Sequence, residues 1–253
     1  MIVSQTTMKK YFLIFFLAFS QFAVAQKMIN AVMVGESGVT EDVKKAKFLI
    51  VVKTYDDTAF ERLEYNFTGS MKRCLTYKDA MLKTLQGRYV NFYPSGIISS
   101  EGNYVDNKKD GSWYLYDDTS HAITEYQYHL DTLLAAINLD SLALEKKKVT
   151  EDTIGEHEAE YKGGEKSFSK FISQNLKIPE RTQSLEAGGT VRVRFIVNKE
   201  GKVTNIRIWK SVEFAFDEEA LRVVSLSKGW TPAIQRGRKV NAYREQPITI
   251  SFK

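Results

Sequence analysis

The sequence predicts two folded parts. The first is an α+β C-terminal domain with two helices on a three-stranded antiparallel sheet, and the second is a mainly-β N-terminal repeat domain of antiparallel hairpins. Residues 188–210 alternate apolar and polar side chains on both sides of a glycine-containing turn, which indicates a β-hairpin. Residues 163–179 carry apolar side chains at helical spacing. Residues 85–128 repeat short aromatic stretches separated by turns, which indicates a series of similar hairpins.

The hairpin in residues 188–210 has one apolar face that needs a cover. Its first strand places Val191, Val193, Phe195 and Val197 on that face, and the turn falls at 198–201. An isolated hairpin is at best marginally stable in water, so the flanking segments must pack against it.

Two amphipathic segments and one further strand supply this cover. Before the hairpin, an apolar helical face is followed by Pro179, which ends the helix; its members are Phe168, Phe171, Ile172 and Leu176. After the hairpin, we expect Asp217 to cap a helix over 218–226, with an acidic first turn that suits the helix dipole. A last strand over 247–253 completes the sheet.

The N-terminal part begins with a weakly patterned lead-in over 27–40, followed by a strand over 47–55 and its return over 60–67. The sequence Tyr-Asp-Asp-Thr at 55–58 recurs at 116–119, which indicates repeated hairpins over 26–130. We expect large rings in this region to stack across neighbouring strands, namely Tyr89, Tyr104, Trp113 and Tyr116. Residues 131–145 read as a helix, and the rest of 131–160 reads as a charged linker before the domain at 161–253.

The first 25 residues have the pattern of a secretory signal peptide. A basic start at 8–10 precedes an apolar run that ends in Ala-Val-Ala, so we expect cleavage between Ala25 and Gln26 and a periplasmic product. The alternative is a retained inner-membrane anchor, although the run is shorter than the roughly 20 residues of a spanning helix. Cys74 is the only cysteine, so no disulfide can form within the chain.

Charge is unevenly divided, since residues 160–253 contain 18 Lys and Arg against 10 Asp and Glu. A basic end module suits anionic envelope material or an acidic protein surface, but it equally describes a solvated face. We expect no nucleic-acid partner, because the basic residues lack interleaved aromatics and the chain is predicted to be exported.

We find no pattern of catalytic or cofactor-binding residues. The sequence lacks a phosphate-binding loop, a dinucleotide fingerprint, a nucleophile elbow and a His-Glu-x-x-His motif. His157 stands among glutamates at 156, 158 and 160, and we interpret it as a solvated residue and not as a metal ligand. The chain is therefore expected not to be an enzyme and to need no cofactor or metal.

The ordered motifs of residues 161–253 resemble a known family. They are Gly-Gly-Glu before a short helix that ends in proline, the Gly-x-Val-x-Val-x-Phe-x-Val hairpin, then FDEEALRVV, Trp-Thr-Pro-Ala, QRGRKV and PITISF. This set is similar to the C-terminal domain of TonB-family energy transducers of the Bacteroidetes type. Residues 85–128 in turn resemble MORN-type repeats of the YwqK-like group, on the elements Tyr-Pro-Ser-Gly, Glu-Gly-x-Tyr and Lys-Lys-Asp-Gly-x-Trp.

The TonB resemblance implies a partner, an outer-membrane TonB-dependent receptor, and a mode of binding. An extended receptor segment would pair with the exposed edge of the last strand, where unpaired N–H and C=O groups are available. The edge residues are Pro247, Ile248, Thr249, Ile250, Ser251 and Phe252. The chain departs from the family's pattern, because its anchor reads as cleavable and it has no Pro-rich spacer, so energy coupling to transport does not follow from the resemblance.

A second function is left open by the sequence. A soluble cell-envelope interaction protein, contacting peptidoglycan or another protein through the aromatic repeats and the basic module, would transmit no energy. A homodimer is also compatible with the sequence, and the repeats have a purely structural interpretation as a β-meander.

Overall fold

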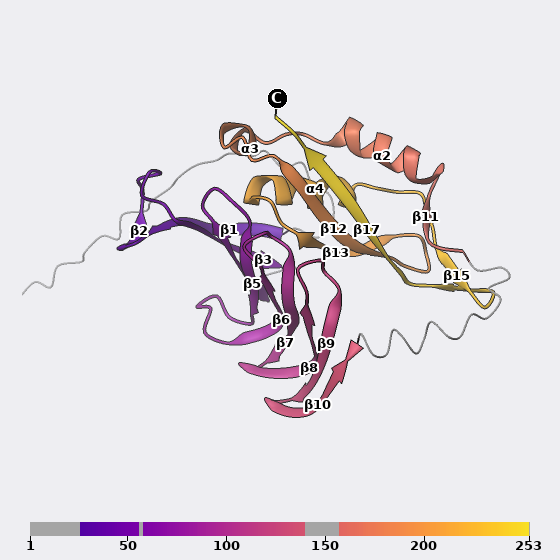
Figure 1. The fold of residues 1–253 in the computed structure, drawn as a ribbon, viewed down its shortest axis with the longest axis horizontal. Helices are drawn as coiled ribbons and strands as arrows, with labels where there is room; N and C mark the ends of the chain where they lie inside the picture. The colour runs from indigo at the N-terminus through magenta and orange to yellow at the C-terminus, as the bar shows by residue number, and fades with distance from the viewer. Residues whose placement is uncertain (1–25, 56–57, 140–156, 253) are drawn as a thin grey trace, which may run out of the picture.

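The computed structural model describes residues 26–55, 58–139 and 157–252. Figure 1 shows a large twisted sheet built from the N-terminal half, with the C-terminal elements gathered along one side of it. The predicted fold class, mainly β in the N-terminal half with helices and antiparallel strands in the C-terminal half, is therefore confirmed in its coarse form.

The large sheet has ten antiparallel strands in the order β10-β9-β8-β7-β6-β5-β4-β3-β1-β2. They are β1 (Gln26–Gly35), β2 (Gly38–Thr40), β3 (Phe48–Tyr55), β4 (Ala59–Asn66), β5 (Met71–Tyr77), β6 (Leu85–Phe92), β7 (Ile98–Val105), β8 (Lys108–Tyr116), β9 (Ala122–His129) and β10 (Thr132–Asn138). Consecutive strands from β3 to β10 pair with one another as a meander. The expectation of a weakly structured lead-in over 27–40 was wrong, because these residues form β1 and β2. β1 pairs with the side of β3 that faces away from β4 and satisfies the backbone groups there.

The helix expected over 131–145 was also wrong where the structure describes it. Thr132–Asn138 forms β10 and pairs with β9, while residues 140–156 lie outside the described residues. Leu130 and Asp131 both have positive φ, 47° and 72°, which turns the chain back tightly after β9. Pairing with an existing strand thus outweighs the helical spacing of Leu133, Leu134 and Ile137.

The C-terminal part contains a three-stranded antiparallel sheet in the order β13-β12-β17. Its strands are β12 (Gly189–Val197), β13 (Val203–Lys210) and β17 (Ala242–Ile250), and its helices are α2 (Gly164–Asn175), α3 (Glu180–Ser184) and α4 (Phe214–Ser225). Two small strand pairs lie beside them, β11 (Glu160–Tyr161) with β14 (Trp230–Thr231) and β15 (Ala233–Gln235) with β16 (Arg238–Val240). The expectation of two helices missed the short α3.

The helices α2 and α4 cover the apolar face of this sheet. Val191, Val193 and Val197 of β12 are fully buried beneath them. Phe168 of α2 lies with its ring 6.3 Å from that of Phe195 and 4.8 Å from that of Trp230. The packing confirms the apolar faces predicted for β12 and α2.

Helix α4 begins earlier than predicted. Glu213 is its N-cap, and the side chain accepts hydrogen bonds from the backbone N–H of Ala215 (3.0 Å) and Phe216 (2.8 Å). Asp217, the predicted cap, lies inside the first turn and is fully buried. Glu213 and Asp217 are four positions apart, and either could cap the helix. Asp217 is buried against the large sheet, so Glu213 is the cap.

The two parts share one hydrophobic core. Leu63, Tyr65 and Val90 of the large sheet belong to the same buried cluster as Trp209 and Phe216 of the C-terminal part. The chain therefore packs its two sequence-predicted parts directly on one another.

Candidate partner-binding edge and the interface that positions it

The outer side of β17 is a regular strand edge that pairs with no other described strand. β17 pairs with β12 over nine consecutive residues, from Gly189 opposite Ile250 to Val197 opposite Ala242, without any shift in register. Among the strands that the structure describes, none pairs with the other side of β17. The backbone groups that face this side can bond to an added strand, although Pro247 has no N–H to donate and its carbonyl oxygen accepts from the Gln246 side chain at 2.8 Å.

Four of the six predicted edge residues lie in β17. Ile248 and Ile250 point into the core, and Pro247 and Thr249 are exposed on the opposite face. The strand starts five residues before the predicted position, at Ala242, and Pro247 lies within it, as is tolerated in edge strands. Ser251 and Phe252 follow the strand and are exposed.

The opposite edge of the same sheet is held by the large sheet. Lys210 at the end of β13 forms a β-bridge with Ile97, and the N–H of Ser211 donates to the carbonyl oxygen of Gly96 at 2.9 Å. β13 also carries two register shifts against β12, and Asn205 has a φ of 48°. A bulged strand with an occupied end is a poor template for strand addition, which leaves β17 as the regular edge.

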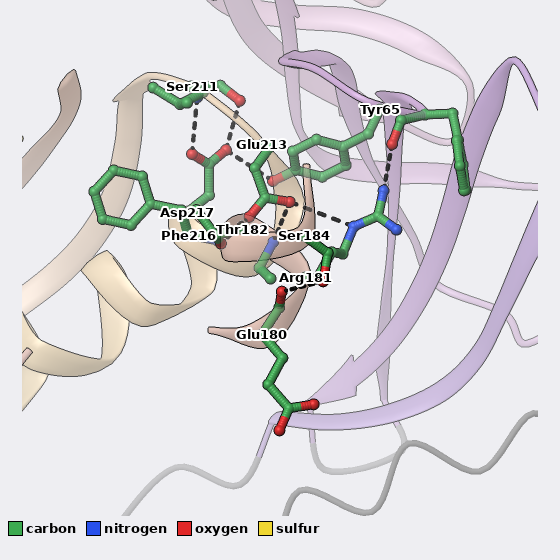
Figure 2. A network of polar contacts seen from close by, with 12 residues as sticks. Tyr65, Glu180, Arg181, Thr182, Ser184, Ser211, Glu213, Phe216 and Asp217 are labelled. Atoms are coloured by element: carbon green, nitrogen blue, oxygen red, sulfur yellow. Dashed lines mark hydrogen bonds and ion pairs between the residues drawn. The ribbon is translucent and has the colours of Figure 1, made fainter. Parts of the chain in front are cut away.

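A buried polar network joins α4 to the large sheet (Figure 2). The hydroxyl groups of Tyr65 (3.0 Å) and Ser211 (2.5 Å) both donate to Oδ2 of Asp217, and the N–H of Val212 donates to Oδ1 at 3.0 Å. The Ser211 hydroxyl in turn accepts from the backbone N–H of Met71 at 2.7 Å. These bonds connect β4, β5 and α4 across the shared core.

Burial dominates the electrostatics of this network. It raises the pKa of Asp217 to about 8, although the three donors act in the opposite direction. Burial, followed by the nearby Asp217, also raises the pKa of Tyr65 well above its usual value. Both raised pKa values mean that the neutral carboxyl group of Asp217 and the neutral phenol of Tyr65 are favoured in the core. The charged form of either group would lose its hydration there.

A second network next to it orders α3. Arg181 donates to the carbonyl oxygen of Phe67, and its Nε lies 3.4 Å from Oε2 of Glu213. The Thr182 hydroxyl donates to Oε1 of the same glutamate. Lys53, almost completely buried in β3, pairs with Glu218 of α4. Side chains from both parts thus fix the position of α4 and, through it, of the sheet that carries β17.

The predicted aromatic stack forms with three of its four members. Tyr89, Tyr104 and Trp113 lie with ring centroids 5.1–5.5 Å apart. Tyr116 was wrongly grouped with them, because it is on the other face of β8 and stacks edge-on against Trp209 at 5.0 Å. Trp113 covers Gly102, where a Cβ atom would lie 2.2 Å from the indole.

Several residues singled out in the sequence lie outside the β17 edge and the two polar networks. Cys74 is buried, and burial raises the pKa of its thiol. Among residues 26–55, 58–139 and 157–252, no group of three or more His, Cys, Asp or Glu side chains could hold a metal. His157 is exposed.

Over the same ranges, no helix has the length and apolar character needed to cross a membrane. Of the predicted cleavage site, Gln26 is the first residue of β1, and Ala25 lies outside the described residues.

Sequence reasoning missed the residues of both networks except Asp217. Tyr65 reads as one more aromatic residue in an alternating strand, and Ser211 and Glu213 read as part of a loop. The one available signal was the pair of acids at 213 and 217, because a helix start needs only one of them as a cap.

Comparison with known proteins gives one family. Residues 174–253 match the family model of the Gram-negative bacterial TonB protein C-terminal. No curated protein matches the chain. Among solved structures, the solution NMR structure of the Helicobacter pylori TonB C-terminal domain matches at 24% identity, covering 34% of this chain and 78% of that one, with a TM-score of 0.28. The C-terminal third of the chain is thus similar to the C-terminal domain of TonB proteins.

Proposed function

We propose that this protein is a TonB-like protein of the cell envelope that binds an extended periplasmic segment of an outer-membrane receptor. The segment adds to the sheet as a fourth strand along β17. Support comes from the TonB match over residues 174–253 and, above all, from the regular outer edge of β17, which pairs with no strand in the described part of the chain.

The physical basis of the proposal is the difference between the two edges of the small sheet. β13 is bulged and its end is bonded to the turn at Gly96, so it offers few aligned backbone groups. β17 offers a nine-residue strand in register with a buried neighbour. An added strand there would satisfy backbone groups that otherwise bond to water.

In this proposal the protein acts in the periplasm. If residues 11–25 are retained as an anchor, the same contact also couples the inner membrane to the receptor and thus to transport. If they are cleaved, the protein binds without transmitting force.

The test is site-specific photo-crosslinking in the native cell envelope. A photoreactive side chain at Thr249 on β17 should cross-link to an outer-membrane receptor, identified by mass spectrometry of the product. The matched control is Thr204, an exposed threonine on β13. Equal receptor cross-linking from both positions, or none from position 249, would contradict the proposal.

A second measurement tests strand addition itself. A peptide of the cross-linked receptor segment is N-methylated at alternate residues in two sets. In an edge pairing only every second N–H points at β17, so one set should abolish binding and the other should leave it nearly unchanged. Equal effects of the two sets would exclude a strand-addition mode.

A further inference from the structure

A polar cleft lies between the two parts of the molecule, and Tyr243 near the start of β17 belongs to its wall. It has a volume of about 510 Å³ and is bounded by β6, β7 and β8 on one side and by the small sheet on the other. Its wall includes Arg88, Glu101, Tyr114, Arg194, Arg207 and Tyr243. The size falls within the range of small-ligand sites.

Positive charge exceeds negative charge around this cleft. Glu101 is shared by Arg207 at 3.0 Å and Arg88 at 3.4 Å, and it also accepts from the hydroxyl of Tyr116 at 2.7 Å. One carboxylate therefore serves two guanidinium groups and a phenol.

An excess of guanidinium groups over carboxylates is also found between the paired strands β12 and β17. Glu245 of β17 pairs with both Arg192 and Arg194, each at 2.9 Å. Four guanidinium groups thus meet two carboxylates on this face, and three of the four belong to the cleft wall.

Hydrogen-bonding capacity is also left over. The Nε atoms of Arg88 and Arg207 are buried and have no hydrogen-bond partner among the described residues. Burial, opposed by Glu101 but assisted by Arg88 and Arg194, lowers the pKa of Arg207. Buried donors without partners and a guanidinium group with incomplete charge compensation both indicate a missing acceptor.

Arg194 is oriented before any ligand arrives. Its guanidinium carbon lies 3.2 Å from the ring centroid of Trp209, which is itself buried and packed against Tyr116. About a quarter of the Arg194 side chain remains exposed. A stacked, partly open guanidinium group suits planar or tetrahedral oxyanions, which it binds in a bidentate way.

We propose that this cleft binds a compact anion that carries carboxylate or phosphate groups, with Arg194 and Arg207 as its principal ligands. The inference goes beyond receptor binding at β17 and does not depend on it. The neutral polar side chains of Asn103, Ser112 and Asn205 complete the wall and supply further hydrogen-bonding groups.

Isothermal titration calorimetry tests the site with inorganic phosphate and with succinate, at constant ionic strength in chloride. Saturable one-site binding is expected for at least one of the two. Tighter binding of phosphate identifies a phosphate-bearing ligand, and tighter binding of succinate identifies a carboxylate-bearing one. Absence of saturable binding by either probe overturns the proposal.

The variant Asn205→Asp puts a negative charge into the cleft without removing an interface contact. It should weaken binding of the preferred probe by about tenfold or more. Both residue types accept the φ of 48° at this position, so the fold is retained. The control Asn241→Asp carries the same charge change outside the cleft wall, and equal weakening by both variants would overturn the assignment.

A second pair of variants keeps the test independent of position 205. Arg192 and Arg194 bind the same glutamate, but only Arg194 belongs to the cleft wall. Arg194→Gln should lose probe binding, whereas Arg192→Gln should retain it. Retained binding in Arg194→Gln would remove this residue from the site and refute the proposal.

Discussion

Asp217 illustrates how one side chain serves the interface instead of the helix end. As a cap it would be half-exposed and charged, but it lies buried between Tyr65 and Ser211, and burial raises its pKa to about 8. The carboxyl group in the unfolded chain ionises near 3.8. Between these two pH values the folded protein holds a proton that the unfolded chain releases.

The sign of the pH dependence follows from this difference. The stabilisation that Asp217 contributes to the folded state is fully present below about pH 4. It is lost as the pH rises toward about 8. In this window the unfolding free energy of the wild type should fall by up to about 1.4 kcal/mol per pH unit because of Asp217. The Asp217→Asn variant, whose side chain stays neutral, should lack this fall. Urea unfolding of both proteins from pH 5 to pH 8 measures the difference.

The control for this experiment is Asp118→Asn, at an exposed turn position. It should leave the pH profile of the wild type unchanged. An Asp217→Asn profile with the wild-type slope would mean that the carboxyl group is ionised in the folded protein.

At the scale of elements, the turn between β6 and β7 holds β13 in place. Gly96 has a φ of 80°, and a Cβ atom there would lie 2.1 Å from the carbonyl oxygen of Ser211. Gly96→Ala must therefore push β13 away from the large sheet. Gly111 has a φ of 69°, and no atom of the described residues lies within 4 Å of a Cβ atom built there, so Gly111→Ala carries only the cost of the backbone conformation.

We expect Gly96→Ala to lose about 2 kcal/mol more unfolding free energy than Gly111→Ala. Urea titrations of the two variants and the wild type measure this. Equal losses would show that the turn is not in close contact with β13 in solution.

Elements whose signals are local could be predicted from the sequence. The β12–β13 hairpin and α2 follow from alternation and helical spacing, and both form near the expected residues. β10 and the start of α4 could not be predicted in this way. β10 forms because its residues pair with β9, and α4 starts where it does because Glu213 and Asp217 bond to residues distant in sequence. The start of β17 was misplaced because residues 242–246 lack a clear apolar alternation.

At the scale of the whole molecule, the chain reads as two domains and packs as one unit. Tyr116 carries the same pattern as Tyr89 and Trp113 in sequence, but its position on β8 turns it toward Trp209. Nothing in one sequence pairs residues that lie about 90 positions apart. For the same reason the edge of β17 could be predicted as a candidate site, whereas the networks and the cleft that surround the small sheet could not.

The two hydrogen bonds that cross the interface make its opening measurable by amide hydrogen exchange. The amide of Met71 in the large sheet donates to the Ser211 side chain, and the amide of Ser211 donates back to Gly96. Each N–H is shielded from water only while the two parts stay together. In hydrogen exchange these two amides should show one opening free energy, equal to that of the most protected core amides, if separation requires global unfolding. A lower opening free energy for this pair alone would reveal a state in which the two parts come apart while each remains folded.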